Sequence, residues 1–216
     1  MFRPSSGSRL GRHPPDLEEN NRVKLYPNGT GLSRNLLTHA RQDGRIADMD
    51  ADITCDLSER LLNAATLPAL RAKWREEGKR VVFTNGCFDI LHLGHVTYLS
   101  WARAQGDILV VGLNSDASVR RNKGPKRPIV GERDRAALLL SLRCVDYVCI
   151  FDEDTPYDLI SLIVPDVLVK GRDWAGNVVG SDIVEAAGGR VALADLVAGR
   201  STTGIIECVL DVYGQR

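Results

Sequence analysis

Short apolar runs alternate with amphipathic segments from about residue 80 to the end of the chain. The runs are rich in Val, Ile and Leu, as strands buried on both faces of a parallel sheet require. The expected strands span 80–85, 107–113, 146–151, 166–170 and 190–194. The segments between and after them have helical spacing, and the expected helices span 95–105, 116–121, 132–143, 156–163, 181–187 and 202–213. This alternation predicts an α/β fold with an open, parallel, five-stranded sheet and helices on both faces.

The part of the chain before residue 80 has a different pattern. Residues 1–55 are rich in Arg, Asn, Gly, Pro and Asp without a sustained apolar period, so we expect a flexible or partly ordered, irregular N-terminal extension. A short helix is expected around 32–41. Residues 57–77 have helical spacing, and Pro68 is expected to break that run in two. The predicted organisation is an extension over 1–55 and one Rossmann-like α/β domain over 56–216.

Composition limits the classes of partner. The 216 residues carry 28 basic and 28 acidic side chains, so zero net charge gives no reason to expect nucleic acid or an anionic membrane surface as a partner. The hydrophobic fraction is 44%, and no apolar run approaches the ~20 residues that span a bilayer. The five cysteines form no CxxC pair. We therefore expect reduced thiols in a cytoplasmic protein.

The candidate chemistry is concentrated in one segment, from Asn85 to His95. It joins the first expected strand of the sheet to the next helix, at the strand's carboxyl end, where ligands bind in such sheets. His92 and His95 flank Gly94 at the expected helix start, so both rings can face the same anion, and the helix dipole favours negative charge there. The spacing therefore predicts a site for a nucleotide phosphate.

The residues before the histidines suit a turn against that phosphate. Gly86 lets the backbone approach an anion closely, and the amides of Cys87 and Phe88 can then face it. Asp89 is expected either to hold the turn by accepting hydrogen bonds or to contact the ligand. Cys87 is interpreted as a small residue that fills the turn, because no histidine–carboxylate arrangement is evident that would activate a nucleophilic thiol.

These residues also carry a resemblance. Phe88-Asp89 followed by His92-Leu93-Gly94-His95 resembles the signature of the nucleotidylyltransferase superfamily, with its HxGH motif. The longer string 83–95 resembles one branch, the D-glycero-β-D-manno-heptose 1-phosphate adenylyltransferases or ADP-heptose synthases. Other segments resemble the same branch: 114–118, 123–124, 127–128, 145–148, 153–156, 165–171 and 201–203. The resemblance covers about residues 70–210.

The resemblance implies a reaction in which the phosphate oxygen of a sugar 1-phosphate attacks the α-phosphorus of ATP and pyrophosphate leaves. Because the attacking oxygen is already ionised, catalysis rests mainly on positioning and charge stabilisation. The resemblance implies that His92 and His95 bind the triphosphate and that Lys123, in a loop suited to act as a lid, contacts the leaving phosphates. Mg²⁺ is expected with ATP, and no residue is assigned as a metal ligand.

Two sets of binding residues are implied in the same way. The nucleotide-binding set is Asn85, Gly86, Cys87, Phe88, Asp89, Gly94, Lys170, Gly171, Asp173, Ser201, Thr202 and Thr203. The substrate-binding set is Asn114, Asp116, Arg127 and Arg135. Structural roles stay open for several of them: helix capping for Asp116 and Ser201, and a salt bridge for Arg135. Trp174 either stacks near the nucleotide or sugar, or lies in an ordinary exposed loop.

ATP and a sugar 1-phosphate are the expected small-molecule partners, and the resemblance implies a homodimer. Because only about 70 residues precede the transferase region, too few for the kinase domain of many family members, we expect a stand-alone adenylyltransferase. A separate heptose kinase and phosphatase would then act upstream. Two other functions stay open: a related cytidylyltransferase acting on glycerol 3-phosphate or another small phosphate, and a non-catalytic nucleotide-binding regulator.

Overall fold

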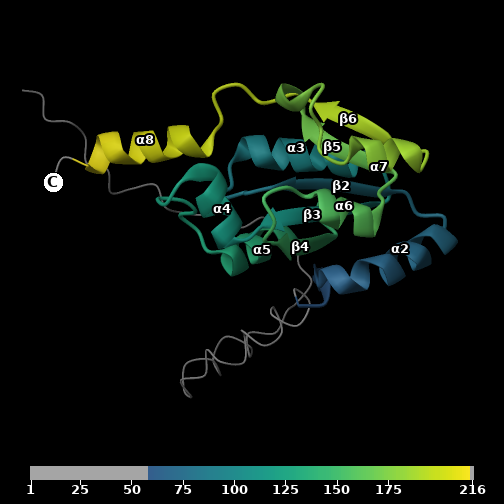
Figure 1. Ribbon diagram of the computed structural model, residues 1–216. Coiled ribbons are helices and arrows are strands. Elements are labelled where there is room, and N and C mark those ends of the chain that lie inside the picture. Colours follow the sequence, from purple (N-terminus) through teal and green to yellow (C-terminus); the bar gives the residue numbers. More distant parts are fainter. Residues whose placement is uncertain (1–57, 215–216) are drawn as a thin grey trace, which may run out of the picture. The chain divides into compact units, whose positions relative to one another are not determined.

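The computed structural model describes residues 58–214, so the predicted extension at 1–55 and its helix at 32–41 lie outside the described residues. The strands within the described part are β1 (Leu61–Leu62), β2 (Val81–Gly86), β3 (Ile108–Asn114), β4 (Tyr147–Phe151), β5 (Val167–Gly171) and β6 (Arg190–Ala194). They form one parallel sheet in the order β1-β4-β3-β2-β5-β6 (Figure 1). The predicted parallel α/β architecture is confirmed.

Helices connect the strands and cover both faces of the sheet. They are α2 (Leu67–Glu76), α3 (Leu93–Arg103), α4 (Asp116–Lys123), α5 (Glu132–Leu140), α6 (Tyr157–Ile163), α7 (Ser181–Ala186) and α8 (Thr202–Tyr213), with 3-10 turns η2 (Ala64–Thr66) and η3 (Arg172–Trp174). Buried residues of α3 and α5 pack on one face, and those of α2, α6 and α7 pack on the other. The helices therefore leave the carboxyl edge of the sheet to the loops.

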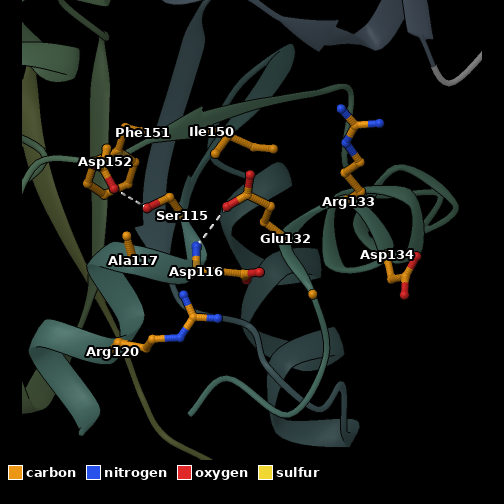
Figure 2. Close-up of a pocket in the computed structure, with 11 residues that line it drawn as sticks. Ser115, Asp116, Ala117, Arg120, Glu132, Arg133, Asp134, Ile150, Phe151 and Asp152 are labelled. Atoms are coloured by element: carbon orange, nitrogen blue, oxygen red, sulfur yellow. Dashed lines mark hydrogen bonds between the residues drawn. The ribbon is translucent and has the colours of Figure 1, made fainter. Parts of the chain in front are cut away.

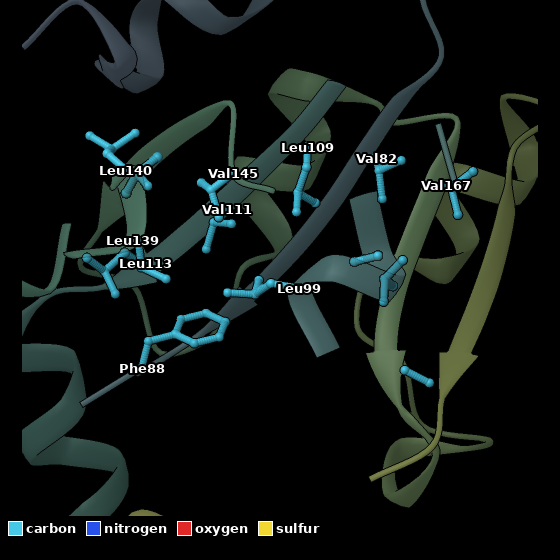
Figure 3. Packing of buried hydrophobic residues seen from close by; sticks show 14 of the residues in the cluster. Val82, Phe88, Leu99, Leu109, Val111, Leu113, Leu139, Leu140, Val145 and Val167 are labelled. Atoms are coloured by element: carbon cyan, nitrogen blue, oxygen red, sulfur yellow. The ribbon is translucent and has the colours of Figure 1, made fainter. Parts of the chain in front are cut away.

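The core consists of two layers separated by the sheet. Within β2, Val82 belongs to the same core layer as Leu99 of α3 and Leu139 of α5 (Figure 3). Its neighbours Val81 and Phe83 belong to the opposite layer. All three strand residues are fully buried. This explains why β2 is a continuous apolar run, since alternate side chains enter two different cores.

The structure differs from the expectation in the segment before β2. A sixth strand, the two-residue β1, pairs with β4 at the edge of the sheet, where a helix had been expected. Pro68 lies in the first turn of α2 and does not break a helix. Proline fits there because its missing N–H has no intrahelical partner in the first turn and its fixed φ suits the helix.

The strand order places a topological switch point at β2. The chain proceeds from β2 to β3 and β4 on one side, and then returns to add β5 and β6 on the other side. The carboxyl ends of β2 and β5 are therefore neighbours whose following loops diverge, which is where ligands bind in doubly wound sheets. Within residues 58–214, no helix is both long and apolar enough to cross a bilayer.

Candidate functional site

The turn after β2 is anchored by an aromatic side chain. Phe88 has φ of 45°, a left-handed conformation that is uncommon outside glycine. Its ring is 94% buried in the α3/α5 layer and meets His95 edge-on, with ring centroids 5.2 Å apart. A Cβ on Gly86 would lie 3.0 Å from that ring. The turn is therefore wedged into the core, and its shape is tied to the position of His95.

The two predicted histidines lie together at the start of α3. Their rings stack with centroids 3.9 Å apart and planes inclined by 20°. Gly94 makes this arrangement possible, because a Cβ there would lie 3.0 Å from Cε1 and Nδ1 of His92. The Nδ1 atoms of both rings are buried and find no hydrogen-bond partner among the described residues. Since buried polar atoms are nearly always paired, these two atoms point to a ligand.

The environment keeps the histidine pair neutral. Burial, and then the charge of His92, lower the pKa of His95 to about 4, although the backbone of Ile90 opposes the shift. Burial, followed by the charge of Arg200, also lowers the pKa of His92. Stacked rings at this distance disfavour two positive charges. A negatively charged ligand would oppose that shift, because it favours the protonated form of a nearby imidazole.

A buried lysine stands across the switch point from the histidines. Lys170 is the last residue but one of β5, and its Nζ donates to Oδ1 of Asn85 on β2 and lies 5.5 Å from the ring centroid of Trp174. Burial lowers the pKa of Lys170 to about 8, against the opposing charge of Asp173. A Cβ on Gly171 would lie 2.3 Å from Oδ1 of Asp173, so that carboxylate would have to move away. A partly desolvated cation is thus held at the edge of the site.

The start of α8 also lies beside the histidines. Ser201 caps the helix, since its Oγ accepts a hydrogen bond from the Gly204 amide at 3.0 Å. The capping role that had stayed open for Ser201 is therefore filled, while Thr202 and Thr203 follow in the first turn. Arg200 was missed from the sequence. Its Cβ lies 3.3 Å from the position of a Cβ on Gly94, and a cation next to a Ser-Thr-Thr helix start was the available signal.

Lys123 approaches the turn from the other side. It is the last residue of α4 and is exposed, and Gly124 then takes φ of 92°. Its charge acts on Cys87, although burial is the larger effect and raises the pKa of that thiol. A thiol with a raised pKa is a poor nucleophile. This environment supports the interpretation of Cys87 as a residue that fills the turn.

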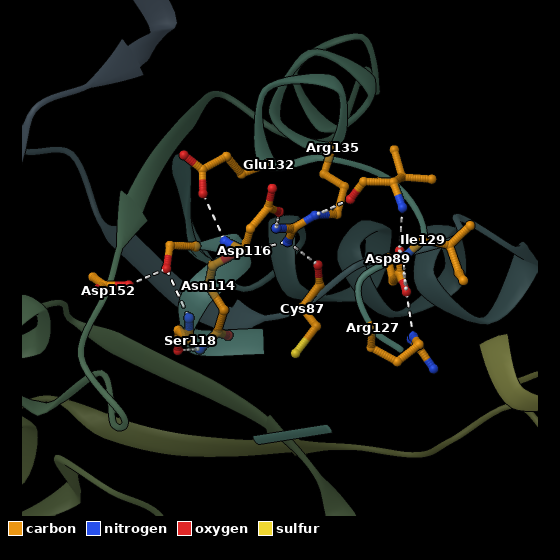
Figure 4. Close-up of polar contacts among 12 residues, drawn as sticks. Cys87, Asp89, Asn114, Asp116, Ser118, Arg127, Ile129, Glu132, Arg135 and Asp152 are labelled. Atoms are coloured by element: carbon orange, nitrogen blue, oxygen red, sulfur yellow. Dashed lines mark hydrogen bonds and ion pairs between the residues drawn. The ribbon is translucent and has the colours of Figure 1, made fainter. Parts of the chain in front are cut away.

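The four predicted substrate-binding residues are bonded mainly to the protein itself (Figure 4). Arg135 is 0% exposed, so the direct substrate contact expected of it does not fit this burial. It forms the open alternative, a salt bridge, with Asp116 at 2.7 Å. Asn114 donates to Oγ of Ser118 at 3.0 Å, and Arg127 pairs with Asp89. The carboxylate of Asp116 is the most accessible polar group of the set, at 28% exposed.

A hollow of about 760 Å³ lies beside this group, between the starts of α4 and α5 and the end of β4 (Figure 2). Its lining includes Ser115, Asp116, Arg120, Glu132 and Asp152. The histidines do not line it. Asp116 therefore stands between the hollow and Arg135, which in turn contacts the histidine-bearing turn.

The described residues do not form a metal centre of their own. Between positions 58 and 214, no three His, Cys, Asp or Glu side chains are grouped so that they could hold a metal ion.

The comparisons with known proteins point to the same elements. Residues 83–197, more than half of the chain, match the cytidylyltransferase-like family. The chain is 63% identical over 142 residues to "Bifunctional protein HldE" of Syntrophotalea carbinolica, covering 65% of this chain and 29% of the relative. For the protein of that name from Geobacter sulfurreducens, identity is 57% over 154 residues, covering 71% and 31%. The chain spans about a third of the length of these relatives.

A solved structure described as the lipopolysaccharide core biosynthesis protein from Thermoplasma volcanium GSS1 is 31% identical, with a TM-score of 0.47. The match covers 56% of this chain and 98% of that one. The family match spans β2 to the loop after β6 and contains the histidine turn, Lys123 and Lys170. The chain belongs to the cytidylyltransferase-like family.

Proposed function

We propose that this chain is a sugar-phosphate adenylyltransferase that joins AMP from ATP to a heptose 1-phosphate, giving ADP-heptose and pyrophosphate. The observation that carries the proposal is the stacked pair His92 and His95, whose buried Nδ1 atoms have no partner among the described residues. The segments that resemble ADP-heptose synthases and the identity of 54–63% to proteins named "Bifunctional protein HldE" support the heptose acceptor.

The residues present suit charge stabilisation better than acid–base catalysis. The attacking group is an ionised phosphate, so the reaction needs no strong base, and the negative charge that builds up at the α-phosphorus needs fixed donors. His92 and His95 would stand at that phosphate, with Lys123 on the leaving pyrophosphate. The amides of Cys87 and Phe88 lie in the turn before them. Catalysis would then follow from holding the reacting oxygen and phosphorus in line.

The other residues of the predicted nucleotide set lie around the same edge of the sheet. Lys170, held by Asn85, presents a cation whose burial makes its interaction with a phosphate or ribose oxygen stronger than in water. Trp174 is 48% exposed beside it and is placed to stack on a flat ring. We infer that this side, between β2 and β5, holds the nucleoside, with Gly171 and Asp173 nearby.

The hollow beside Asp116 is the proposed place of the sugar. Its lining carries carboxylates, guanidinium groups and a hydroxyl, which are the groups that bond a molecule rich in hydroxyls. The phosphate of the acceptor would then point from the hollow toward the histidine turn. Mg²⁺ would arrive with ATP, and no step of the mechanism is assigned to a protein-bound metal.

Three further parts of the proposal concern the cellular setting. A cytoplasmic location agrees with the thiols, since the described cysteines 87, 144, 149 and 208 are unpaired. A homodimer, and a separate heptose kinase and phosphatase upstream, are proposed from the resemblance. The division into an extension over 1–55 and a transferase domain over 56–216 is proposed from the composition of the sequence.

The test is an assay of pyrophosphate release with purified protein. ATP, CTP and GTP are each supplied with heptose 1-phosphate and with glycerol 3-phosphate. We expect turnover with ATP and heptose 1-phosphate, and a loss of about 10²-fold in kcat for His92→Ala or His95→Ala, the scale of removing one transition-state donor. Tyr157→Phe, which removes only an exposed hydroxyl bonded to Asp182, is the control and should leave turnover unchanged.

The same panel separates the alternatives. Turnover confined to CTP and glycerol 3-phosphate would overturn the proposal in favour of the related cytidylyltransferase, an activity that the name of the matched family also allows. Binding of ATP without turnover on any acceptor would favour a non-catalytic nucleotide-binding regulator. Near-wild-type rates in both histidine variants would contradict the assigned mechanism, whichever acceptor is used.

A further inference from the structure

A fully buried carboxylate ties the histidine turn to the loop that follows Lys123. The side chain of Asp89 is 0% exposed. It accepts a charged hydrogen bond from Nε of Arg127. It also accepts hydrogen bonds from the backbone amides of Ile129 and Val130, and the shortest N···O distance of each amide is 2.8 Å. All three donors come from one four-residue segment, about 40 positions further along the chain (Figure 4).

The tie is strong because the carboxylate is both buried and fully supplied with donors. Burial on its own raises the pKa of Asp89, but the hydrogen bonds from Val130, Ile129 and Arg127 outweigh it and hold that pKa below its ordinary value. A buried charge that loses a partner is destabilising out of proportion to one exposed ion pair. The segment from Arg127 to Val130 is therefore held against the turn as a unit.

A second tie holds the other end of α4 through Arg135. Its Nη2 donates to Oδ1 of Asp116, the first residue of α4, at 2.7 Å. Its Nη1 donates to the carbonyl of Cys87 in the histidine turn at 2.6 Å and to that of Asn114 at 2.9 Å. Nε donates to the carbonyl of Val130 at 2.9 Å. One guanidinium thus joins the turn, the end of β3, the start of α4 and the loop after it.

Lys123 lies between these two ties. It ends α4, whose first residue is fixed by Arg135, and it precedes by four positions Arg127, which is fixed by Asp89. Only the short link over 124–126 separates the lysine from the second tie. Its backbone can therefore move little with respect to the turn that carries the histidines, even though its side chain is exposed.

We propose that Asp89 and Arg127 are positioning residues, which set Lys123 against the histidine pair, and that they do not contact the nucleotide or the sugar phosphate. The proposal rests on the proposed function, because it assigns these residues to the same transfer reaction. It replaces the direct ligand contacts that the sequence had indicated for both. If the proposal holds, Asp89 and Arg127 affect turnover only by positioning Lys123.

The test is a double-mutant cycle that combines Asp89→Asn or Arg127→Met with Lys123→Ala. Each positioning variant should lower kcat by about 10- to 100-fold in the wild-type background, the scale of misplacing a group by a fraction of an ångström to one ångström. In the Lys123→Ala background the same change should lower kcat by less than about 2-fold, because the group that it positions is already gone. KM for the sugar phosphate should stay within about 2-fold of its wild-type value.

An exposed ion pair of the same helix supplies a matched control. Asp154→Asn removes the exposed partner of Arg121 on α4, and should leave kcat unchanged because that pair does not reach the turn. Losses that multiply fully in the cycle would overturn the proposal. An Arg127→Met variant with normal kcat and a raised KM for the sugar phosphate would overturn it as well, since that result indicates direct substrate contact.

Amide hydrogen exchange supplies a readout that does not depend on activity. Asp89→Asn should speed exchange of the Ile129 and Val130 amides by more than about 10-fold, because these donors lose a charged acceptor, and should leave α6 unchanged. Unchanged exchange at both amides would refute the tie. If the wild-type protein shows no adenylyl transfer, the proposed function fails while this measurement still decides whether the tie exists. If Asp89→Asn does not fold, Arg127→Met, which changes an 18% exposed side chain, is measured in its place.

Discussion

Replacing Gly94 by alanine should separate activity from stability in this protein. The new Cβ would lie 3.0 Å from Cε1 and Nδ1 of His92 and 3.3 Å from Cβ of Arg200. Ordinary contacts at such positions begin near 3.4 Å, so the imidazole must shift by a few tenths of an ångström or rotate out of the stack on His95. The fold does not depend on that ring, because His92 is not part of either core layer.

Gly94→Ala should lower kcat without lowering the free energy of unfolding. A displaced donor should lower kcat by about tenfold or more, since an error of 1 Å in a reacting geometry can remove about 10²-fold. Alanine within a helix is favoured over glycine by about 0.5–1 kcal/mol, and Gly94 lies in the first turn of α3. The free energy of unfolding should therefore stay constant or rise slightly while turnover falls.

The assay pairs pyrophosphate release with urea unfolding followed by circular dichroism. Tyr157→Phe is the control, because it removes only an exposed hydroxyl bonded to Asp182, and its turnover should match the wild type. If Gly94→Ala retained full kcat, the reasoning about the histidine stack would be refuted. A large loss of stability in that variant would show instead that the clash disturbs the turn itself.

Three other perturbations test the charges of the site. The pKa of His95 is lowered to about 4 in the folded protein, so the unfolded chain binds the proton first, and stability should fall as pH drops below about 6.5. Between pH 7 and pH 5 the loss should be about 1–2 kcal/mol in urea unfolding, and it should be clearly smaller in His95→Gln, where the lowered pKa of His92 remains. Lys170→Met should raise Tm, because the buried ammonium, with its pKa lowered to about 8, destabilises the free protein near neutral pH. It should also raise KM for ATP, because the cation proposed to contact the nucleotide is lost. A lower Tm with unchanged KM would contradict the assignment of Lys170 to the nucleotide. Arg135→Lys should lower the free energy of unfolding by about 3 kcal/mol, because an ammonium cannot make the four hydrogen bonds that the guanidinium donates to three backbone carbonyls and to Asp116. A loss below about 1 kcal/mol would show that the guanidinium is not needed there.

The sheet was predictable because its strands are local signals. Each of β2 to β6 is a Val-, Ile- or Leu-rich run that begins and ends within about one residue of its predicted limits. The two-residue β1 was not predictable, since it has no period and exists only through its pairing with β4. Pro68 was misjudged for a related reason: the sequence shows a proline in a helical run, but only the structure shows that the helix starts one residue before it.

Some residues of the candidate site were likewise predictable from the sequence, and others were not. The histidine turn follows the end of β2 and Lys170 lies in the last two residues of β5, so their positions come directly from the topology. The partners of Asp89 and Arg135 lie between 5 and 48 positions away in the chain, and residue types alone do not say whether a charged side chain turns inward or toward a ligand. In the structure, Arg135 is 0% exposed and pairs with Asp116. Arg200 was missed although it directly precedes the Ser-Thr-Thr helix start, and its approach to Gly94 gives it a place in the site.

The identity of the product tests the central claim most directly. Wild-type protein is incubated with ATP and heptose 1-phosphate, and the products are resolved by liquid chromatography and mass spectrometry. The account predicts ADP-heptose and pyrophosphate in equal amounts. The His95→Ala variant, which removes the ring whose centroid lies 3.9 Å from that of His92, should form them about 10²-fold more slowly. A product that carries a cytidylyl group when CTP is added to the same mixture, with ATP left unconsumed, would contradict it.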